Sequence, residues 1–152
     1  MSSTMSASSD ASNPAPPLRV ALLGLGTVGG GLAEIFDAHG AQLAARAGGA
    51  LSVVGVAVRD LGKVRDLPVD PALLTTDAAS LAVRDDVDVV VELIGGLEPA
   101  RTLVLAALHA GKAVVTANKA IVARYGAEFA AAAAAGAGQL YYEAAAAGAV
   151  PV

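Results

Sequence analysis

The 152-residue sequence contains no cysteine and no tryptophan, and only 3% of its residues are aromatic. The absence of cysteine excludes a disulfide scaffold, a thiolate metal site and a thiol nucleophile. Long apolar runs are also missing, although 55% of the residues are hydrophobic. A membrane-spanning helix needs about 20 consecutive apolar residues. The best stretch, residues 129–140, is mostly alanine and is interrupted by Gly136, Gly138 and Gln139, so we expect no membrane span.

Positive charge is scarce as well. The sequence has ten Lys and Arg residues and 14 Asp and Glu residues, which gives a net charge of -4. A nucleic-acid-binding protein, by contrast, needs a basic face. Residues 1–17 are rich in Ser, Ala and Pro, and they lack the basic and apolar regions of a secretory signal. We expect a disordered tail there, on a cytoplasmic protein that binds neither nucleic acid nor membrane.

From Leu18 onward, short apolar runs alternate with segments of helical pattern. Predicted strands cover residues 18–23, 51–58, 87–94, 113–116 and 139–143. Predicted helices cover residues 32–39, 77–83, 97–110 and 118–135, with Asp77 as an N-cap, and the alanine run of the last helix fits close packing against a sheet. Residues 61–76 contain Pro68 and Pro71 and are predicted to be irregular. This alternation predicts an α/β fold of the Rossmann type, a doubly wound parallel sheet, over residues 18–152.

A glycine-rich turn follows the first predicted strand, with the sequence Gly24-Leu25-Gly26-Thr27-Val28-Gly29. In a dinucleotide-binding domain the first glycine of GxGxxG allows the tight turn, the second lets the backbone approach a pyrophosphate, and the third lets the helix pack on the strand. Free N–H groups at the helix start then face the phosphates. All six residues are therefore candidate cofactor-binding residues, and the alternative is a glycine-rich turn without a ligand.

The end of the second predicted strand carries charge. In Rossmann domains an Asp or Glu at this place binds the ribose 2′-OH of NAD, and an Arg accommodates the 2′-phosphate of NADP. Here Arg59 follows the strand, Asp60 comes next, and Lys63 and Arg65 lie shortly behind. Arg59 and Lys63 favour NADP, although Asp60 leaves NAD open. Alternatively, Arg59 is only a solvated loop charge.

Glu92 is unusual because it lies inside an otherwise apolar predicted strand. A buried carboxylate needs partners, so Glu92 is either functional or part of a hydrogen-bond network. The two histidines, His39 and His109, fall on predicted helices and suggest no catalyst.

Three further motifs carry a family resemblance. They are the stretches VELIGGLEPA at residues 91–100, VTANKA at residues 115–120, and YEA with GAVP between residues 142 and 151. With the glycine turn, they resemble the cofactor domain of homoserine dehydrogenase from about residue 18 to residue 152. The resemblance implies hydride transfer between L-homoserine and L-aspartate 4-semialdehyde with NAD(P), in threonine, isoleucine and methionine biosynthesis.

The resemblance also implies roles for single residues. Lys119 would lie near the nicotinamide and the substrate and contribute to cofactor binding and catalysis. Thr116 and the backbone at Gly95 and Gly96 would line the nicotinamide site. Alternatively, Lys119 is a surface lysine at a helix start, where a cation opposes the helix dipole.

A monovalent cation, usually sodium, is implied by the resemblance alone. Its ligands would be Glu143 and the backbone carbonyls of Ala146, Gly148 and Val150. Ala146 and Ala149 stand where the family often has Val and Gly, and the change at Ala149 bears on the loop geometry.

The resemblance further implies a substrate domain with acidic residues and another lysine, which we do not find in the sequence, and a homodimer formed mostly by that region. We therefore expect the 152-residue chain alone to retain at most cofactor binding. Two other hypotheses are another NAD(P)-dependent amino-acid or imine dehydrogenase, and a nonenzymatic module that senses NAD(P).

Overall fold

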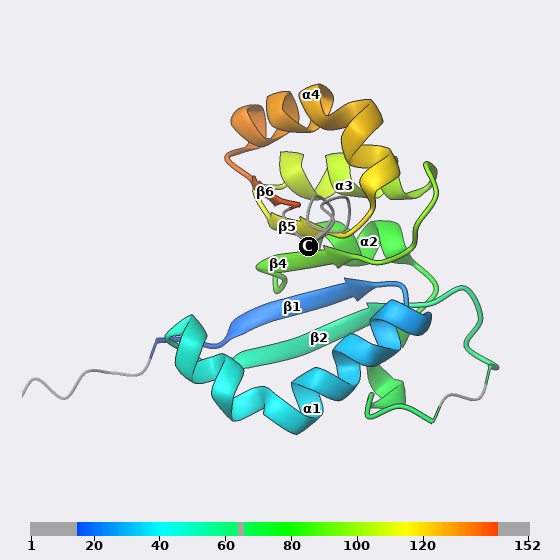
Figure 1. Ribbon diagram of the computed structural model, residues 1–152, viewed down its shortest axis with the longest axis vertical. Helices are drawn as coiled ribbons and strands as arrows, with labels where there is room; N and C mark the ends of the chain where they lie inside the picture. Colours follow the sequence, from blue (N-terminus) through cyan, green and yellow to red (C-terminus); the bar gives the residue numbers. More distant parts are fainter. Residues whose placement is uncertain (1–14, 64–65, 143–152) are drawn as a thin grey trace, which may run out of the picture.

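The computed structural model describes residues 15–63 and 66–142 (Figure 1). Residues 1–14 of the predicted tail lie outside this part of the chain, as do the residues from Glu143 onward. Within the described residues, six parallel strands form one sheet in the order β3-β2-β1-β4-β5-β6. The strands are β1 (Leu18–Leu23), β2 (Leu51–Ala57), β3 (Leu74–Thr75), β4 (Val89–Glu92), β5 (Ala113–Thr116) and β6 (Gln139–Tyr141).

Helices cover both faces of the sheet, as the doubly wound prediction requires. They are α1 (Thr27–Ala47), α2 (Ala78–Val83), α3 (Ala100–His109) and α4 (Lys119–Gly136). Helix α1 lies against one face, and α2, α3 and α4 lie on the other (Figure 1). Among the described residues, no helix is long and apolar enough to cross a membrane. The predicted Rossmann-type α/β fold is confirmed.

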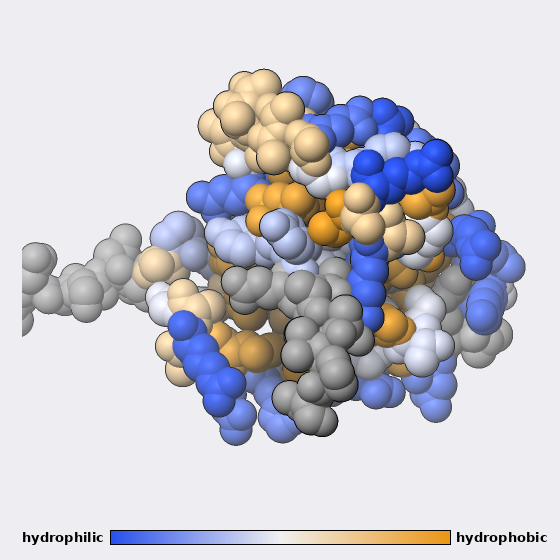
Figure 2. Space-filling model, turned by 45° about the horizontal axis from the view of Figure 1, so that its top comes forward, coloured by the Kyte–Doolittle hydropathy of each residue, from blue (hydrophilic) through white to orange (hydrophobic). Residues whose placement is uncertain are grey.

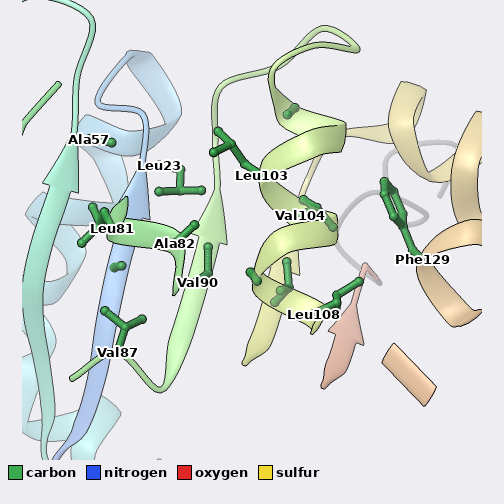
Figure 3. Close-up of a cluster of buried hydrophobic side chains, with 14 of the residues drawn as sticks. Leu23, Ala57, Leu81, Ala82, Val87, Val90, Leu103, Val104, Leu108 and Phe129 are labelled. Atoms are coloured by element: carbon green, nitrogen blue, oxygen red, sulfur yellow. The ribbon is translucent and has the colours of Figure 1, made fainter. Parts of the chain in front are cut away.

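The central strand β1 shows why the core divides into two. Its side chains alternate between the faces: Ala21 and Leu23 join one buried cluster, and Val20 and Leu22 join the other. In the cluster beneath α2 and α3, Leu23 meets Leu81 and Leu103, while Phe129 reaches in from α4 (Figure 3). A strand buried on both faces is continuously apolar, which is why its sequence could be recognised.

Two predicted segments need correction. The helix predicted over residues 32–39 is much longer: α1 begins at Thr27, directly after the glycine turn, and continues past a kink at His39 (φ -126°, ψ 15°) to Ala47. Glycines disfavour a helix in isolation, but here Gly29 and Gly30 are buried within α1. The segment 61–76, predicted to be irregular, contains a 3-10 turn at Pro71–Leu73 and the edge strand β3.

Two further predicted helices are present with somewhat shorter bounds. Helix α2 begins after Asp77, whose Oδ1 accepts the N–H of Ser80 at 2.9 Å, as predicted. Helix α3 begins at Ala100 and is shorter than the predicted 97–110.

The alanine run of α4 only partly fits the close packing predicted for it. Ala132 is buried, but Ala130, Ala131, Ala134 and Ala135 are exposed. The space-filling view shows pale orange apolar surface on the outside of α4 (Figure 2). The close approach occurs at the end of the helix instead, where a Cβ built on Gly136 would lie 2.3 Å from the carbonyl oxygen of Leu108 in α3.

This contact predicts opposite effects for two glycines of one helix. Gly136→Ala places a methyl group against the α3 backbone, and we expect it to lower the free energy of unfolding by about 1–3 kcal/mol. At Gly126, no atom of the described residues lies within 4 Å of an added Cβ. Gly126→Ala should therefore raise the free energy of unfolding by up to about 1 kcal/mol through helix propensity. Urea denaturation of both variants tests this, and equal effects would contradict the contact.

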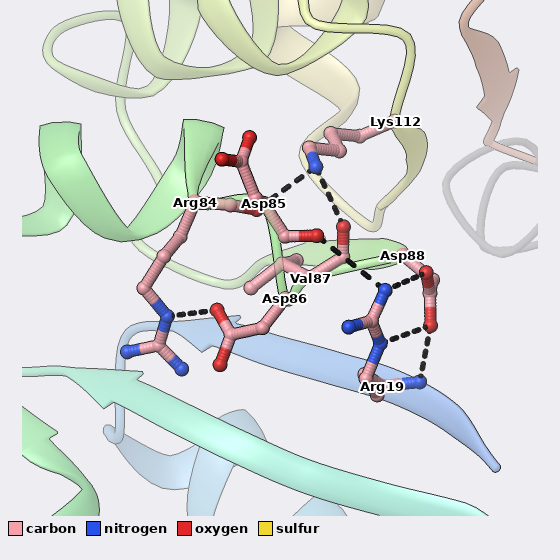
Figure 4. Close-up of polar contacts among 7 residues, drawn as sticks. All are labelled: Arg19, Arg84, Asp85, Asp86, Val87, Asp88 and Lys112. Atoms are coloured by element: carbon pink, nitrogen blue, oxygen red, sulfur yellow. Dashed lines mark hydrogen bonds and ion pairs between the residues drawn. The ribbon is translucent and has the colours of Figure 1, made fainter.

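The amino-terminal edge of the sheet is held by ion pairs and carbonyl contacts (Figure 4). Asp88, just before β4, accepts hydrogen bonds from the backbone N–H of Arg19 at 2.8 Å and from its Nε at 2.9 Å. The Lys112 Nζ donates to the carbonyls of Arg84 and Val87 at 2.8 and 2.7 Å. Hydrogen bonds from Arg19 hold the pKa of the Asp88 carboxyl at about 2.

The Asp88 carboxylate predicts a pH-dependent stability. A carboxyl whose pKa is depressed by folding stabilises the fold above its unfolded pKa, and this stabilisation fades as the pH falls from about 4 to about 2. We expect Asp88→Asn to be less stable than the wild type at pH 6, with the difference largely gone near pH 2. Urea denaturation across this range tests it, and a difference independent of pH would contradict it.

Candidate functional site

The glycine turn lies at the carboxyl end of β1, where α1 begins. Gly24 has φ +112° and donates its N–H to the carbonyl of Ala57 in β2 at 3.0 Å. Gly26 is the N-cap of α1, and no side chain among the described residues caps that helix end. Leu25 is half-buried, whereas Thr27 and Val28 are exposed. The first turn of a helix leaves N–H groups without helical partners, so here they are available to an acceptor from outside the helix.

The three glycines of the motif have different steric surroundings. A Cβ on Gly24 would lie 2.9 Å from the Leu93 carbonyl oxygen, and a Cβ on Gly29 would lie 2.5 Å from the Gly24 carbonyl oxygen. A Cβ on Gly26 would meet no atom of the described residues within 4 Å. The fold itself therefore requires small residues at positions 24 and 29, but the described residues give no steric reason for glycine at position 26.

Charged side chains follow β2 at the same edge of the sheet. Val58 is buried, and Arg59 and Lys63 are exposed. Asp60 forms part of its own turn, since its Oδ1 accepts the N–H of Gly62 at 2.8 Å. Arg65 lies outside the described residues. Because β2 pairs with β1, the loop that carries Arg59 starts beside the strand that leads into the glycine turn.

On the other side of β1, Glu92 ends β4 and is completely buried. Its Oε1 accepts the N–H groups of Ile94 at 2.8 Å and Gly95 at 3.1 Å, and its Oε2 accepts the hydroxyl of Thr116 at 2.6 Å. The hydrogen-bond network considered for Glu92 is therefore present. It joins the end of β4 to the end of β5.

The loop after Glu92 contains Gly95 (φ +77°) and Gly96 (φ +69°), both in the left-handed region and both exposed. No atom of the described residues lies within 4 Å of a Cβ built on either one. The loop therefore presents bare backbone at the carboxyl edge of the sheet, where ligands bind in open α/β sheets.

Asn118 connects this loop to α4. Its side-chain Oδ1 accepts the N–H of Ile121 at 3.4 Å as the helix cap, and its Nδ2 donates to the Gly96 carbonyl at 2.7 Å. Lys119 follows as the exposed first residue of α4 and takes part in none of the ion pairs found in the described residues. Asn118 was not among the candidate site residues, because its contact with Gly96 depends on the fold.

The carboxyl ends of β1, β2, β4 and β5 thus carry all the candidate cofactor residues. They do not carry the histidines: His39 lies in the middle of α1, and His109 ends α3. The candidate cation ligands Glu143, Ala146, Gly148 and Val150 lie outside the described residues. Within the described residues, no group of three or more His, Asp or Glu side chains could hold a metal ion.

Comparison with known proteins gives a consistent result. A family model described as "Homoserine dehydrogenase, NAD binding domain" matches residues 24–143. The homoserine dehydrogenase of Corynebacterium glutamicum is 55% identical over 139 residues, which cover 91% of this chain and 31% of that protein. The Mycobacterium tuberculosis homoserine dehydrogenase is 47% identical over 90% of this chain and 30% of its own length. The chain thus spans about a third of the length of the curated relatives that it matches.

Solved structures agree with these matches. The crystal structure of a homoserine dehydrogenase from Thiobacillus denitrificans aligns with a TM-score of 0.77 at 47% identity, over 86% of this chain and 30% of that one. A hyperthermophilic archaeal homoserine dehydrogenase in complex with NADPH aligns with a TM-score of 0.66 at 23% identity, over 85% of this chain and 44% of that one, which shows a shared fold. From the fold, the glycine turn and these matches, we conclude that the chain belongs to the homoserine dehydrogenase family and corresponds to its NAD-binding domain.

Proposed function

We propose that this chain binds NADP across the carboxyl edge of its sheet, as the cofactor-binding part of a homoserine dehydrogenase. The observation that carries the proposal is the open space at Gly26, between two glycines that the fold itself requires. A pyrophosphate bound against the backbone at position 26 explains this glycine, because any larger residue would keep the pyrophosphate away from the backbone.

The start of α1 suits an anion. N–H groups of the first turn point out of the helix, and the helix dipole adds partial positive charge there. No side chain among the described residues occupies these groups as a cap. We expect the pyrophosphate to accept hydrogen bonds at Thr27 and Val28, with Leu25 and Gly29 holding the turn beneath it.

The strand order indicates where each half of the dinucleotide would bind. Dinucleotides bind where the strand order reverses, which here is between β1 and β4. The adenosine half then lies over β2 with Arg59 and Lys63, and the nicotinamide half lies over β4 and β5. There, the exposed backbone of Gly95 and Gly96 would line the nicotinamide, and Thr116, which is completely buried, would support this loop through Glu92.

We expect Lys119 to act at the nicotinamide end. It begins α4, directly after the Asn118 that holds Gly96. The bound cofactor would supply or accept the hydride, and the ammonium group of Lys119 would stabilise negative charge on a cofactor phosphate or on the substrate oxygen. We therefore assign Lys119 to both cofactor binding and catalysis.

The proposal for the whole enzyme follows the family. The reaction would interconvert L-homoserine and L-aspartate 4-semialdehyde, in threonine, methionine and isoleucine biosynthesis, within a cytoplasmic homodimer. A sodium ion at Glu143 and the carbonyls of Ala146, Gly148 and Val150 belongs to the same proposal and rests on family resemblance. The alternatives of another dehydrogenase or a nonenzymatic sensor have no observation in their favour.

Gly26 provides the direct test of cofactor binding. Gly26→Ala adds a methyl group where the described residues leave open space, so we expect the protein to fold normally. NADPH should bind at least about tenfold more weakly, because the methyl displaces the pyrophosphate from the backbone. NADPH fluorescence titration measures this, with Gly31→Ala as the control, since Gly31 in α1 is equally open. Unchanged affinity in Gly26→Ala would contradict the proposal.

Arg59 provides the test of cofactor choice. Arg59→Ala removes the guanidinium proposed to bind the 2′-phosphate, and we expect about tenfold weaker NADPH binding with little change for NADH. Arg46→Ala is the matched control, because Arg46 is an exposed arginine in the last turn of α1. If Arg59→Ala weakens NADPH and NADH equally, the phosphate role is wrong.

A further inference from the structure

Glu92 is the side chain whose position the proposed function leaves unexplained. It is completely buried, at 0% relative exposure, and an isolated carboxylate in such a place is costly. Its two oxygens accept hydrogen bonds from two backbone N–H groups and one hydroxyl. Both oxygens therefore have donors, and all three donors belong to the carboxyl edge of the sheet.

Two of these donors control the loop between β4 and α3. The N–H groups of Ile94 and Gly95 both point to the same oxygen of Glu92, which fixes the loop where it turns into its left-handed glycines. This loop also packs against the glycine turn. A Cβ on Gly24 would lie 2.9 Å from the Leu93 carbonyl oxygen and 3.3 Å from the Ile94 nitrogen.

The third donor closes a ring of hydrogen bonds. Thr116 donates its hydroxyl to Glu92 and accepts the N–H of Asn118 at 3.0 Å. Asn118 then donates its side-chain amide to the Gly96 carbonyl, in the loop that Glu92 holds. The ring therefore connects the bare backbone of Gly95 and Gly96 to the first residues of α4.

We propose that Glu92 is a positioning residue for the nicotinamide half of the cofactor site, a role that rests on the proposed function. Glycines in a loop lose more conformational freedom than other residues when they become ordered. Glu92 orders this loop before the ligand arrives, so binding does not carry that entropic cost. It also aligns the start of α4, and hence Lys119, with the same loop.

The test separates the two halves of the cofactor. Glu92→Gln keeps the side-chain shape and one carbonyl oxygen for the loop, but it turns an NH₂ group toward the Thr116 hydroxyl and reverses that part of the ring. We expect NADPH to bind about fivefold or more weakly, because the Thr116 hydroxyl loses its buried acceptor. Adenosine 2′,5′-bisphosphate, which lacks the nicotinamide half, should bind as it does to the wild type.

Two further variants complete the test, one within the ring of hydrogen bonds and one outside it. Thr116→Val removes the hydroxyl without touching Glu92 and should show the same selective loss of NADPH affinity, even if Glu92→Gln fails to fold. Asp88→Asn is the matched control, because Asp88 precedes β4 as Glu92 ends it and also accepts backbone and side-chain donors. It should leave both affinities unchanged at a temperature where all variants are folded.

The outcomes distinguish this inference from the proposed function. Unchanged NADPH affinity in both Glu92→Gln and Thr116→Val would overturn the positioning role, as would an equal loss for NADPH and the adenosine fragment. If the wild-type chain binds neither compound, the proposed function itself is wrong. A selective loss of NADPH in the ring variants supports the inference.

Discussion

The approach of α1 to the strand before it determines the geometry of the carboxyl edge. Gly29, in the first turn of the helix, has room for only a hydrogen atom against the Gly24 carbonyl. This contact seats the helix end directly over the end of β1. The amino end of α1 consequently opens toward the carboxyl edge of the sheet, and the Leu93 backbone closes the other side of the turn. Two close contacts, of Gly29 with the Gly24 carbonyl and of Gly24 with the Leu93 backbone, thus fix the position of the glycine turn.

Much of this fold could be predicted because its signals are local. Strands buried on both faces are continuously apolar, and Asp77 and Asn118 precede helices that they cap. The start of α1 could not be predicted, because its glycines have poor helix propensity and are held by packing. Strand β3, with only two residues, has no period to detect. The partners of Glu92 could not be identified either, because Thr116 lies 24 residues further along the chain.

The two edges of the sheet carry different kinds of contact. At the amino-terminal edge, Arg19, Asp88 and Lys112 join charged side chains to one another or to backbone carbonyls. At the carboxyl edge lie exposed glycine backbone and the start of α1, which no side chain among the described residues caps. These charged contacts lie at the opposite edge of the sheet from the glycine turn. At the carboxyl edge, Glu92 accepts the Gly95 N–H and Asn118 donates to the Gly96 carbonyl, so these two side chains order the glycine loop.

The central place of β1 has a consequence for how the chain reaches this structure. Although β1 is the first strand in the chain, it pairs with β2 on one side and with β4 on the other. The contact between Arg19 and Asp88 closes a loop of 69 residues. Such non-local pairing delays folding, because the loop-closure entropy must be overcome before the pairing stabilises anything. The β1–β4 side of the sheet therefore depends on a pairing across a much longer stretch of chain than the β1–β2 side.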